Sequence, residues 1–207
     1  MSPAPHDLLR LRDPAALVHE GPPPAWAREH LAASPTVVVR RAPSRDGLLP
    51  VGVRGAVRSE RLAAWLDPAD VAGLIRPEDL AQGRAWRASG QRRVAPLEAL
   101  DAVAALLEER GAGWGPVGGA GFELATGAAC LGPGSDLDLL VRAPAAPDRG
   151  EARRLVEALA RLPVRVDLQL EAPGGAVSLA EYAAEGARVV LRTAAGPRLV
   201  ADPWALR

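Results

Sequence analysis

Two aspartates separated by one leucine, Asp136 and Asp138, are the residues of this sequence best placed to do chemistry together. Residues two apart on a β-strand point to the same side, so both carboxylates project together while Leu137 and Leu139 face the core. Neighbouring carboxylates repel each other, and a hard divalent cation between them relieves the repulsion. Mg²⁺ commonly takes one or two carboxylates together with substrate phosphates. The pair therefore predicts a phosphoryl-transfer site that uses one or two Mg²⁺ ions.

A third aspartate, Asp167, lies on the polar face of the clearest strand in the sequence, which runs from residue 164 to residue 171. Four apolar residues alternate strictly with four polar ones there, so that one face packs and the other stays polar. The apolar positions are Val164, Val166, Leu168 and Leu170. If this strand neighbours the first acidic strand, Asp167 could help to hold a second ion for in-line displacement at phosphorus.

Three glycines precede the acidic strand, and Ser135 comes directly before Asp136. Without Cβ atoms, Gly118, Gly119 and Gly121 let backbone N–H groups approach phosphate oxygens closely. We expect a glycine-rich, phosphate-binding turn here. The alternative is an ordinary turn followed by an edge strand with solvated aspartates.

Arginine side chains offer further phosphate ligands, because the guanidinium fork makes bidentate contacts. Arg54 and Arg58 alternate along one expected strand, and Arg192 is a similar candidate near the end of the chain. Solvation at the surface is the alternative for each of them. His6 ranks first among the three histidines, but their spacing favours solvated or locally hydrogen-bonded imidazoles over a zinc site or a catalytic base.

The composition limits the possible partners and the location. Lys+Arg and Asp+Glu are both 25, so no global field attracts nucleic acid or an anionic membrane. The N-terminus has no apolar signal segment, and nowhere do about 18 apolar residues run together. The single cysteine fits a reducing compartment. We expect a cytoplasmic protein that binds neither nucleic acid nor membrane.

The elements that must position these residues divide into two blocks. The first, residues 1–84, is expected to be a small α+β domain with two strands, a helix capped by Ser59, and a further cap at Asp67-Pro68. The strands are Val37 to Arg41 and Val51 to Val57, and the helix is Leu62 to Leu66. The basic, glycine-interrupted stretch from Gln82 to Ala95 is expected to be an exposed linker.

The second block, residues 94–207, contains two expected helices and a closing hairpin. One helix opens at Pro96 and stops at Gly111, and the other runs from Asp148 to Leu162. The hairpin joins residues 188–193 and 198–201 across Gly196-Pro197. We predict an α/β (α+β) protein in which this second domain has a mixed, largely antiparallel sheet flanked by helices, with the active cleft between the two domains.

The order of glycines, serine and Asp-x-Asp closely resembles the signature of the DNA polymerase beta-like nucleotidyltransferase superfamily. In that signature a Gly-Ser turn precedes a strand that bears Asp-x-Asp or Asp-x-Glu. The likeness extends to one family, the phosphoribosyl-dephospho-coenzyme A transferases of the malonate decarboxylase system. It is carried by WGPVGGAGFELATG, SDLDLLVR, VDLQLEAPGGAVSLAEYA, LRTAAGPRLV and DPW, and in the N-terminal block by HDLLRL and VGVRGAVRSERLAAWL. The resemblance covers nearly the whole chain.

The resemblance implies a metal-dependent nucleotidyltransferase that acts as a holo-acyl-carrier-protein synthase. A serine hydroxyl of the apo acyl-carrier protein subunit of malonate decarboxylase attacks triphosphoribosyl-dephospho-CoA, and pyrophosphate leaves. Asp136 and Asp138 would then be the catalytic metal ligands, with Asp167 in the third position. The donor triphosphate would be held by Gly118, Gly119, Gly121 and Ser135, with Arg54 and Arg192 as further candidates.

One position departs from the family pattern, because this chain has Gly118-Gly119 where the family has Gly-Ser. The missing hydroxyl removes one hydrogen bond, a loss on the order of 0.5–1.5 kcal/mol. Backbone N–H groups remain, so we expect weakened binding rather than lost chemistry. Two alternatives stay open: a related nucleotidyltransferase with another carrier or a small-molecule acceptor, and a non-catalytic binding protein that retains the cleft.

Overall fold

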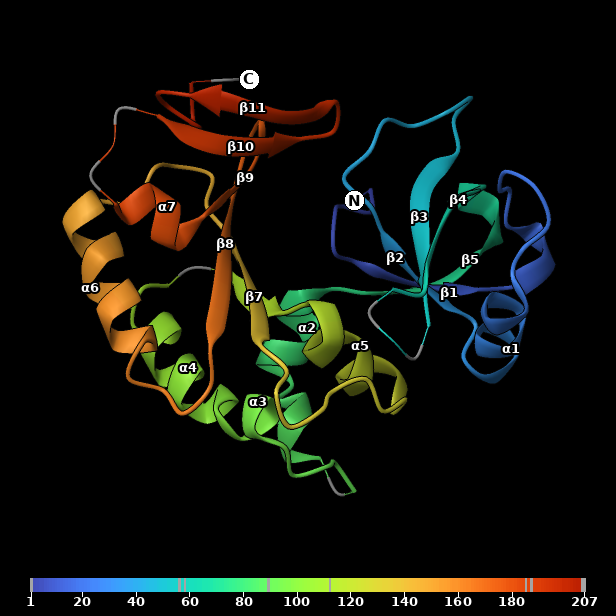
Figure 1. The fold of residues 1–207 in the computed structure, drawn as a ribbon, viewed down its shortest axis with the longest axis horizontal. Helices are drawn as coiled ribbons and strands as arrows, with labels where there is room; N and C mark the ends of the chain where they lie inside the picture. Colours follow the sequence, from blue (N-terminus) through green and yellow to red (C-terminus); the bar gives the residue numbers. More distant parts are fainter. Residues whose placement is uncertain are drawn as a thin grey trace.

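The computed structural model describes residues 2–55, 57, 59–88, 90–111, 113–184, 186 and 188–205. These residues form two β-sheets with helices packed against them, which confirms the predicted α+β fold (Figure 1). The first sheet and helix α1 form one side of the molecule, and the second sheet with helices α4, α6 and α7 forms the other. Among the described residues no helix is long and apolar enough to cross a membrane.

The N-terminal sheet has five strands in the order β4-β3-β2-β1-β5, and all its neighbouring strands are antiparallel. Helix α1 (Ala25–Ala33) covers one face of the sheet, where its buried Ala27 and Leu31 join the core of this domain. The strands are β1 (Leu8–Leu11), β2 (Thr36–Val39), β3 (Leu49–Arg54), β4 (Arg61–Leu66) and β5 (Val71–Ile75). Two 3-10 helices, Pro14–Ala16 and Pro68–Asp70, lie in the connections.

The helix predicted at Leu62 to Leu66 is wrong, because this segment is strand β4. It pairs with β3 along its whole length, from Leu49 opposite Leu66 to Arg54 opposite Arg61. The run is rich in residues that tolerate a helix, but pairing gives partners to the backbone groups that face β3, and Leu66 becomes fully buried. The cap predicted just after it is confirmed, since Asp67 Oδ1 accepts a hydrogen bond from Ala69 N–H at 2.8 Å.

The C-terminal sheet has six strands in the order β11-β10-β9-β8-β7-β6. Only β7 and β8 run parallel among them, so the predicted mixed, largely antiparallel sheet is confirmed. The strands are β6 (Trp114–Pro116), β7 (Leu137–Arg142), β8 (Val166–Ala172), β9 (Gly175–Ser178), β10 (Val189–Thr193) and β11 (Gly196–Val200). Gly196 and Pro197 belong to β11, so the hairpin turns at residues 194–195, just before the predicted position.

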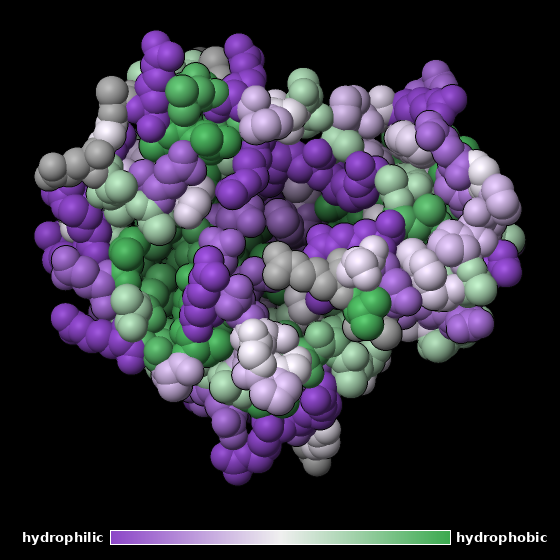
Figure 2. Space-filling view, viewed as in Figure 1, coloured by the Kyte–Doolittle hydropathy of each residue, from purple (hydrophilic) through white to green (hydrophobic). Residues whose placement is uncertain are grey.

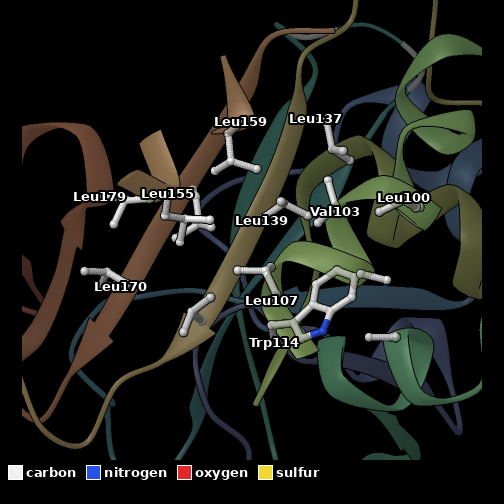
Figure 3. Close-up of a cluster of buried hydrophobic side chains, with 14 of the residues drawn as sticks. Leu100, Val103, Leu107, Trp114, Leu137, Leu139, Leu155, Leu159, Leu170 and Leu179 are labelled. Atoms are coloured by element: carbon white, nitrogen blue, oxygen red, sulfur yellow. The ribbon is translucent and has the colours of Figure 1, made fainter. Parts of the chain in front are cut away.

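Helices cover one face of this sheet and complete a core of leucines (Figure 3). The helix expected from Pro96 is divided into α3 and α4, whereas α6 begins after Asp148 as predicted, with Asp148 Oδ1 accepting from Glu151 N–H at 2.9 Å. The helices of this half are α2 (Pro77–Gln82), α3 (Ala95–Glu98), α4 (Leu100–Glu108), α5 (Gly118–Thr126), α6 (Arg149–Leu159) and α7 (Leu179–Ala183), with a 3-10 helix at Ala85–Arg87.

The segment expected to be an exposed linker packs on the C-terminal half of the molecule. The ring of Trp86 lies 6.2 Å from that of Trp114, and Arg92 contacts the buried Glu123. Leu80 of α2 joins the core of the six-stranded sheet. The polar, basic composition of this stretch favoured an exposed linker. The packing contacts are made by single residues within it, Trp86 and Arg92, which the overall composition does not reveal.

Candidate functional site

Asp138 and Asp167 lie side by side on the two parallel strands of the C-terminal sheet. They are register partners between β7 and β8, strands that are about 4.8 Å apart in any sheet. Leu137 and Leu139 are fully buried in the core, so Asp138 projects from the opposite face. The structure thus brings together two of the three predicted carboxylates.

Asp136 occupies a different setting, because β7 begins at the next residue. Its side chain is 40% exposed, and its Oδ2 lies 3.8 Å from Nη1 of Arg165. Within the described part of the chain, no three His, Cys, Asp or Glu side chains are grouped so as to hold a metal ion. The carboxylates therefore form a pair rather than a triad, and the pair is Asp138 with Asp167.

The predicted glycine-rich turn is the first part of a helix instead, since α5 begins at Gly118. Gly118 has a φ of +58°, and a Cβ at this position would collide with Oδ2 of Asp138. The backbone also ties the two segments together, because Val117 N–H donates to the carbonyl of Asp138 at 2.9 Å. Glycine is required here for both the backbone conformation and the close approach of the carboxylate.

The N-terminus of α5 offers an anion site beside Asp138. No side chain caps this helix, and its first backbone hydrogen bond runs from Gly121 N–H to the carbonyl of Val117. The preceding N–H groups point outward at the positive end of the helix dipole, an arrangement that binds phosphate. Gly121 has a packing role, because a Cβ there would lie 2.5 Å from the carbonyl oxygen of Pro116.

Arg54 reaches from the N-terminal sheet to this helix end. A Cβ at Gly119 would lie 3.2 Å from Nη2 of Arg54 and 2.9 Å from Cδ2 of Leu131. The guanidinium is half-buried, and within the described part of the chain it takes part in no ion pair. Arg58, the other arginine of the expected strand, lies outside the described residues. Arg54 therefore brings a positive charge to Gly119, at the start of α5.

Two other predicted residues lie apart from the carboxylate pair. Arg192 on β10 and Glu171 on β8 are both register partners of Ala176 on β9, so Arg192 lies level with Glu171 across the sheet. Glu171 is four residues further along β8 than Asp167, which places Arg192 away from the carboxylate pair. Ser135 closes a turn instead, because its Oγ accepts from Gly132 N–H at 2.9 Å. That turn leads directly into the acidic segment and fixes its approach to the sheet.

Glu123, in the middle of α5, is a buried carboxylate that the sequence reasoning missed. Its Oε2 accepts from the N–H groups of Cys130 and Leu131 at 2.7 and 2.9 Å, and Arg92 Nη1 lies 3.2 Å from both of its oxygens. These bonds hold the loop between α5 and β7. The sequence did contain a signal for this role, because Glu123 stands within the apolar run GFELATG. A carboxylate buried among apolar residues needs hydrogen-bond partners, so such a position predicts a structural contact.

Ion pairs join the two sheets at the far end of β7 and β8. Glu171 receives two bonds from Arg41, Nη1 to Oε1 at 2.6 Å and Nη2 to Oε2 at 2.5 Å. Arg142, the register partner of Glu171, contacts Asp7 Oδ1 at 3.1 Å and Glu78 Oε1 at 2.8 Å. The pairs Arg41–Glu171 and Arg142–Asp7 thus connect the N-terminal half of the molecule with the polar face that bears Asp138 and Asp167.

His6 lies beside this ion-pair cluster and is partly buried, so the imidazole is not the fully solvated one that was one of the two expectations. Burial, together with the charges of Arg41 and Arg142, lowers the pKa of His6 to about 4, and Glu171 partly opposes them. The imidazole is therefore neutral at pH 7. It is a partly buried neighbour of the ion pairs rather than a base with a pKa suited to proton transfer near neutrality.

A cleft of about 640 Å³ separates the N-terminal sheet from α5 and the polar face of β7 and β8. Asp138, Gly118 and Gly121 line one wall, and Arg54 lines the other. On the face shown in Figure 2, the surface is hollowed between the two halves of the molecule, and hydrophilic residues surround a hydrophobic interior. The volume is within the 300–1,000 Å³ range typical of small-molecule sites.

Comparison with known proteins shows which family the chain resembles. The N-terminal domain of the phosphoribosyl-dephospho-CoA transferase MdcG matches residues 4–77, and the C-terminal domain of the same transferase matches residues 80–203. A phosphoribosyl-dephospho-CoA transferase of Azotobacter vinelandii is 49% identical over 208 residues, covering 98% of this chain and 94% of the relative. The transferases of Pseudomonas putida strain W619 and of Pseudomonas aeruginosa are 46% and 43% identical, covering 99% and 98% of this chain and 97% and 94% of their own lengths. No solved structure matches the chain.

Proposed function

Because the chain belongs to the family of phosphoribosyl-dephospho-CoA transferases, we propose that it attaches a phosphoribosyl-dephospho-CoA group to a serine of a carrier protein. The donor is triphosphoribosyl-dephospho-CoA, and the acceptor is the apo acyl-carrier protein subunit of malonate decarboxylase. The serine oxygen forms a bond to the α-phosphorus, and the bond from that phosphorus to pyrophosphate breaks. The hydroxyl proton is released to solvent.

The proposal rests on one observation: a pair of carboxylates lies next to the N-terminus of a helix that no side chain caps. Asp138 and Asp167 are register partners, and Asp138 lies against Gly118 at the start of α5. A polyphosphate bound to the N–H groups of that helix end would lie beside both carboxylates. This is the arrangement that nucleotidyl transfer needs, with the reacting phosphate between an anion cradle and two oxygen ligands for a cation.

The chemistry of the pair suits Mg²⁺. A hard cation takes one or two carboxylates and completes its shell with substrate phosphates and water, so two adjacent aspartates suffice. Asp138 and Asp167 would hold the ion, with Asp136 close enough in sequence to contribute from the segment before β7. When bound, Mg²⁺ would neutralise the triphosphate and stabilise the departing pyrophosphate.

The residues of the chain then orient the donor. The N–H groups at the start of α5 bind phosphate oxygens, and Gly118 leaves room for Asp138 beside them. Arg54 brings a guanidinium to Gly119 and supplies charge that a serine hydroxyl would not. Because the Arg54 guanidinium can bind the phosphate that the family serine would contact, the reaction does not need a serine at position 119.

Intact-mass spectrometry of the apo carrier protein tests the proposal. Incubation with the donor and Mg²⁺ is expected to add one phosphoribosyl-dephospho-CoA group to the carrier serine and to release one pyrophosphate. A carrier with that serine replaced by alanine should gain no mass. Removal of divalent ions with EDTA should stop the reaction, and added Mg²⁺ should restore it.

The same measurement separates the alternatives. Pyrophosphate release without a gain of mass on this carrier would indicate another acceptor. Binding of the donor with no pyrophosphate release under any of these conditions would indicate a non-catalytic protein. Either result would contradict the proposed reaction.

A further inference from the structure

The face of the N-terminal sheet opposite α1 carries a strip of small and apolar residues. Directly opposed residues of antiparallel strands share one face, and the strip contains one such residue from each of the five strands. It consists of Ile75, Leu8, Val38, Gly52 and Ala63, joined in that order by the strand register. All five line the cleft that faces Asp138.

The strip is separate from the core of the N-terminal domain. The residues that alternate with it, such as Leu9, Val37 and Val51, are fully buried, and with Ala27 and Leu31 of α1 they form that core. An antiparallel sheet with only one covered face usually bears polar residues on the other. Apolar residues on this second face, where they line the cleft, therefore indicate a surface that suits the apolar part of a ligand.

Three arginines border the strip on the same face. Arg40 follows Val38 by two residues on one side, and Arg54 and Arg61, which are register partners, lie on the other side. The stem of Arg40 passes over Gly52, since a Cβ there would lie 3.2 Å from Cδ of Arg40. Neutral surface framed by guanidinium groups fits a ligand that has an uncharged, partly apolar body and phosphate groups.

Arg54 connects this strip with the carboxylate pair, because its guanidinium reaches Gly119 at the start of α5. A ligand whose reacting phosphate lies at α5 could thus extend across the cleft onto the strip without leaving the cavity of about 640 Å³.

We infer that the N-terminal sheet binds the dephospho-coenzyme A part of the donor, with its adenosine on the strip and its diphosphate at the bordering arginines. The C-terminal domain then holds only the triphosphate. The identity of this ligand rests on the proposed function. The assignment gives the N-terminal domain a role in recognition of the donor, apart from the transfer chemistry at Asp138 and Asp167.

Calorimetric titration of the full chain with dephospho-coenzyme A, without donor or carrier protein, tests the inference. The unmodified protein should bind it saturably, and Ala63→Glu should weaken binding at least about 10-fold, or about 1.4 kcal/mol. Ala63 is exposed on the edge strand β4, so a carboxylate there is tolerated by the fold but repels the diphosphate. The matched control is Ala72→Glu, at an exposed position of the opposite edge strand β5 that does not line the cleft.

A second pair of variants keeps the test decisive if Ala63→Glu does not fold. Arg40→Gln should weaken binding, whereas Arg28→Gln on α1, beyond the other face of the sheet, should not. Equal affinities within both pairs, or no saturable binding by the unmodified protein, would overturn the assignment.

Failure of the proposed function gives a different result. In that case the carrier protein gains no mass, while dephospho-coenzyme A still binds in a manner sensitive to residue 63. Asp138→Asn provides the converse check, because it should lose transfer and retain affinity for dephospho-coenzyme A. Loss of that affinity in Asp138→Asn would place the ligand at the carboxylates and contradict the inference.

Discussion

Asp138 and Asp167 occupy matching positions on two adjacent parallel strands and project side by side from the face of the sheet that looks across the cleft. Ordinarily such a pair is unfavourable, because like charges at this distance destabilise each other. Its presence beside an uncapped helix N-terminus is explained if a cation and a polyphosphate bind there together. The relationship leads directly to a first prediction.

Replacing either aspartate by asparagine should abolish transfer without unfolding the protein. Asparagine keeps the shape but loses the negative charge that holds the cation, and we expect Asp138→Asn and Asp167→Asn each to lower the transfer rate by roughly 100-fold or more. Intact-mass assays of the carrier and thermal unfolding would measure the two effects. The control is Asp46→Asn, whose side chain is 90% exposed in a distant turn. Unaltered transfer in Asp138→Asn would refute the assignment.

Gly118→Ala should impair both stability and transfer. The φ of +58° costs a non-glycine residue about 1–2 kcal/mol, and the added methyl group would also push Asp138 away from the helix. A displacement of this kind can cost roughly 100-fold in rate. Gly127→Ala separates the two effects, because Gly127 has a φ of +76° and no atom within 4 Å of an added Cβ. That variant should lose similar stability and keep its transfer rate, and an equal loss of rate in both would contradict the prediction.

The sequence was sufficient to predict features that depend on local periodicity. The alternation around Asp167 identified strand β8, and Asp-x-Asp beside glycines indicated the segment that the structure places against the start of α5. Strand pairing could not be read locally, which is why Leu62 to Leu66 was predicted as a helix and why the partner of Asp138 depended on the register of β7 and β8. The contact between Arg54 and Gly119 joins positions 65 residues apart, and it needs the relative placement of the two sheets.

Acid should destabilise the protein through His6. In the unfolded chain its pKa has the ordinary value of 6.5, but burial lowers the pKa in the folded chain to about 4. Above pH 6.5 both states are neutral and His6 has no effect. As the pH falls from 6.5 towards 4, only the unfolded chain takes up the proton, so the free energy of unfolding decreases, by about 3 kcal/mol once both are protonated.

The variant His6→Asn isolates this contribution, because asparagine tolerates the φ of +73° at this position and does not titrate. Between pH 7.5 and pH 4.5 the unmodified protein should lose about 2.5 kcal/mol more stability than the variant. Urea unfolding at both pH values would measure the difference. Parallel pH profiles for the two proteins would show that the imidazole is solvated in the folded state.

Glu171→Gln should weaken the junction between the two sheets. The side chains of Arg41 and Glu171 are only 14% and 15% exposed, and neutralising one partner leaves a buried charge without compensation, at a cost of about 3 kcal/mol. Glu98→Gln is the matched control, since its pair with Arg93 is 49% and 89% exposed and contributes at most about 1 kcal/mol. Denaturant unfolding would measure both losses. Because Arg41 also lines the cleft, Glu171→Gln should raise the KM for the donor as well, whereas the KM of Glu98→Gln should not change. Equal stability losses in the two variants would mean that the pair between the sheets behaves as a surface pair, and that the two halves of the cleft are held together by other contacts.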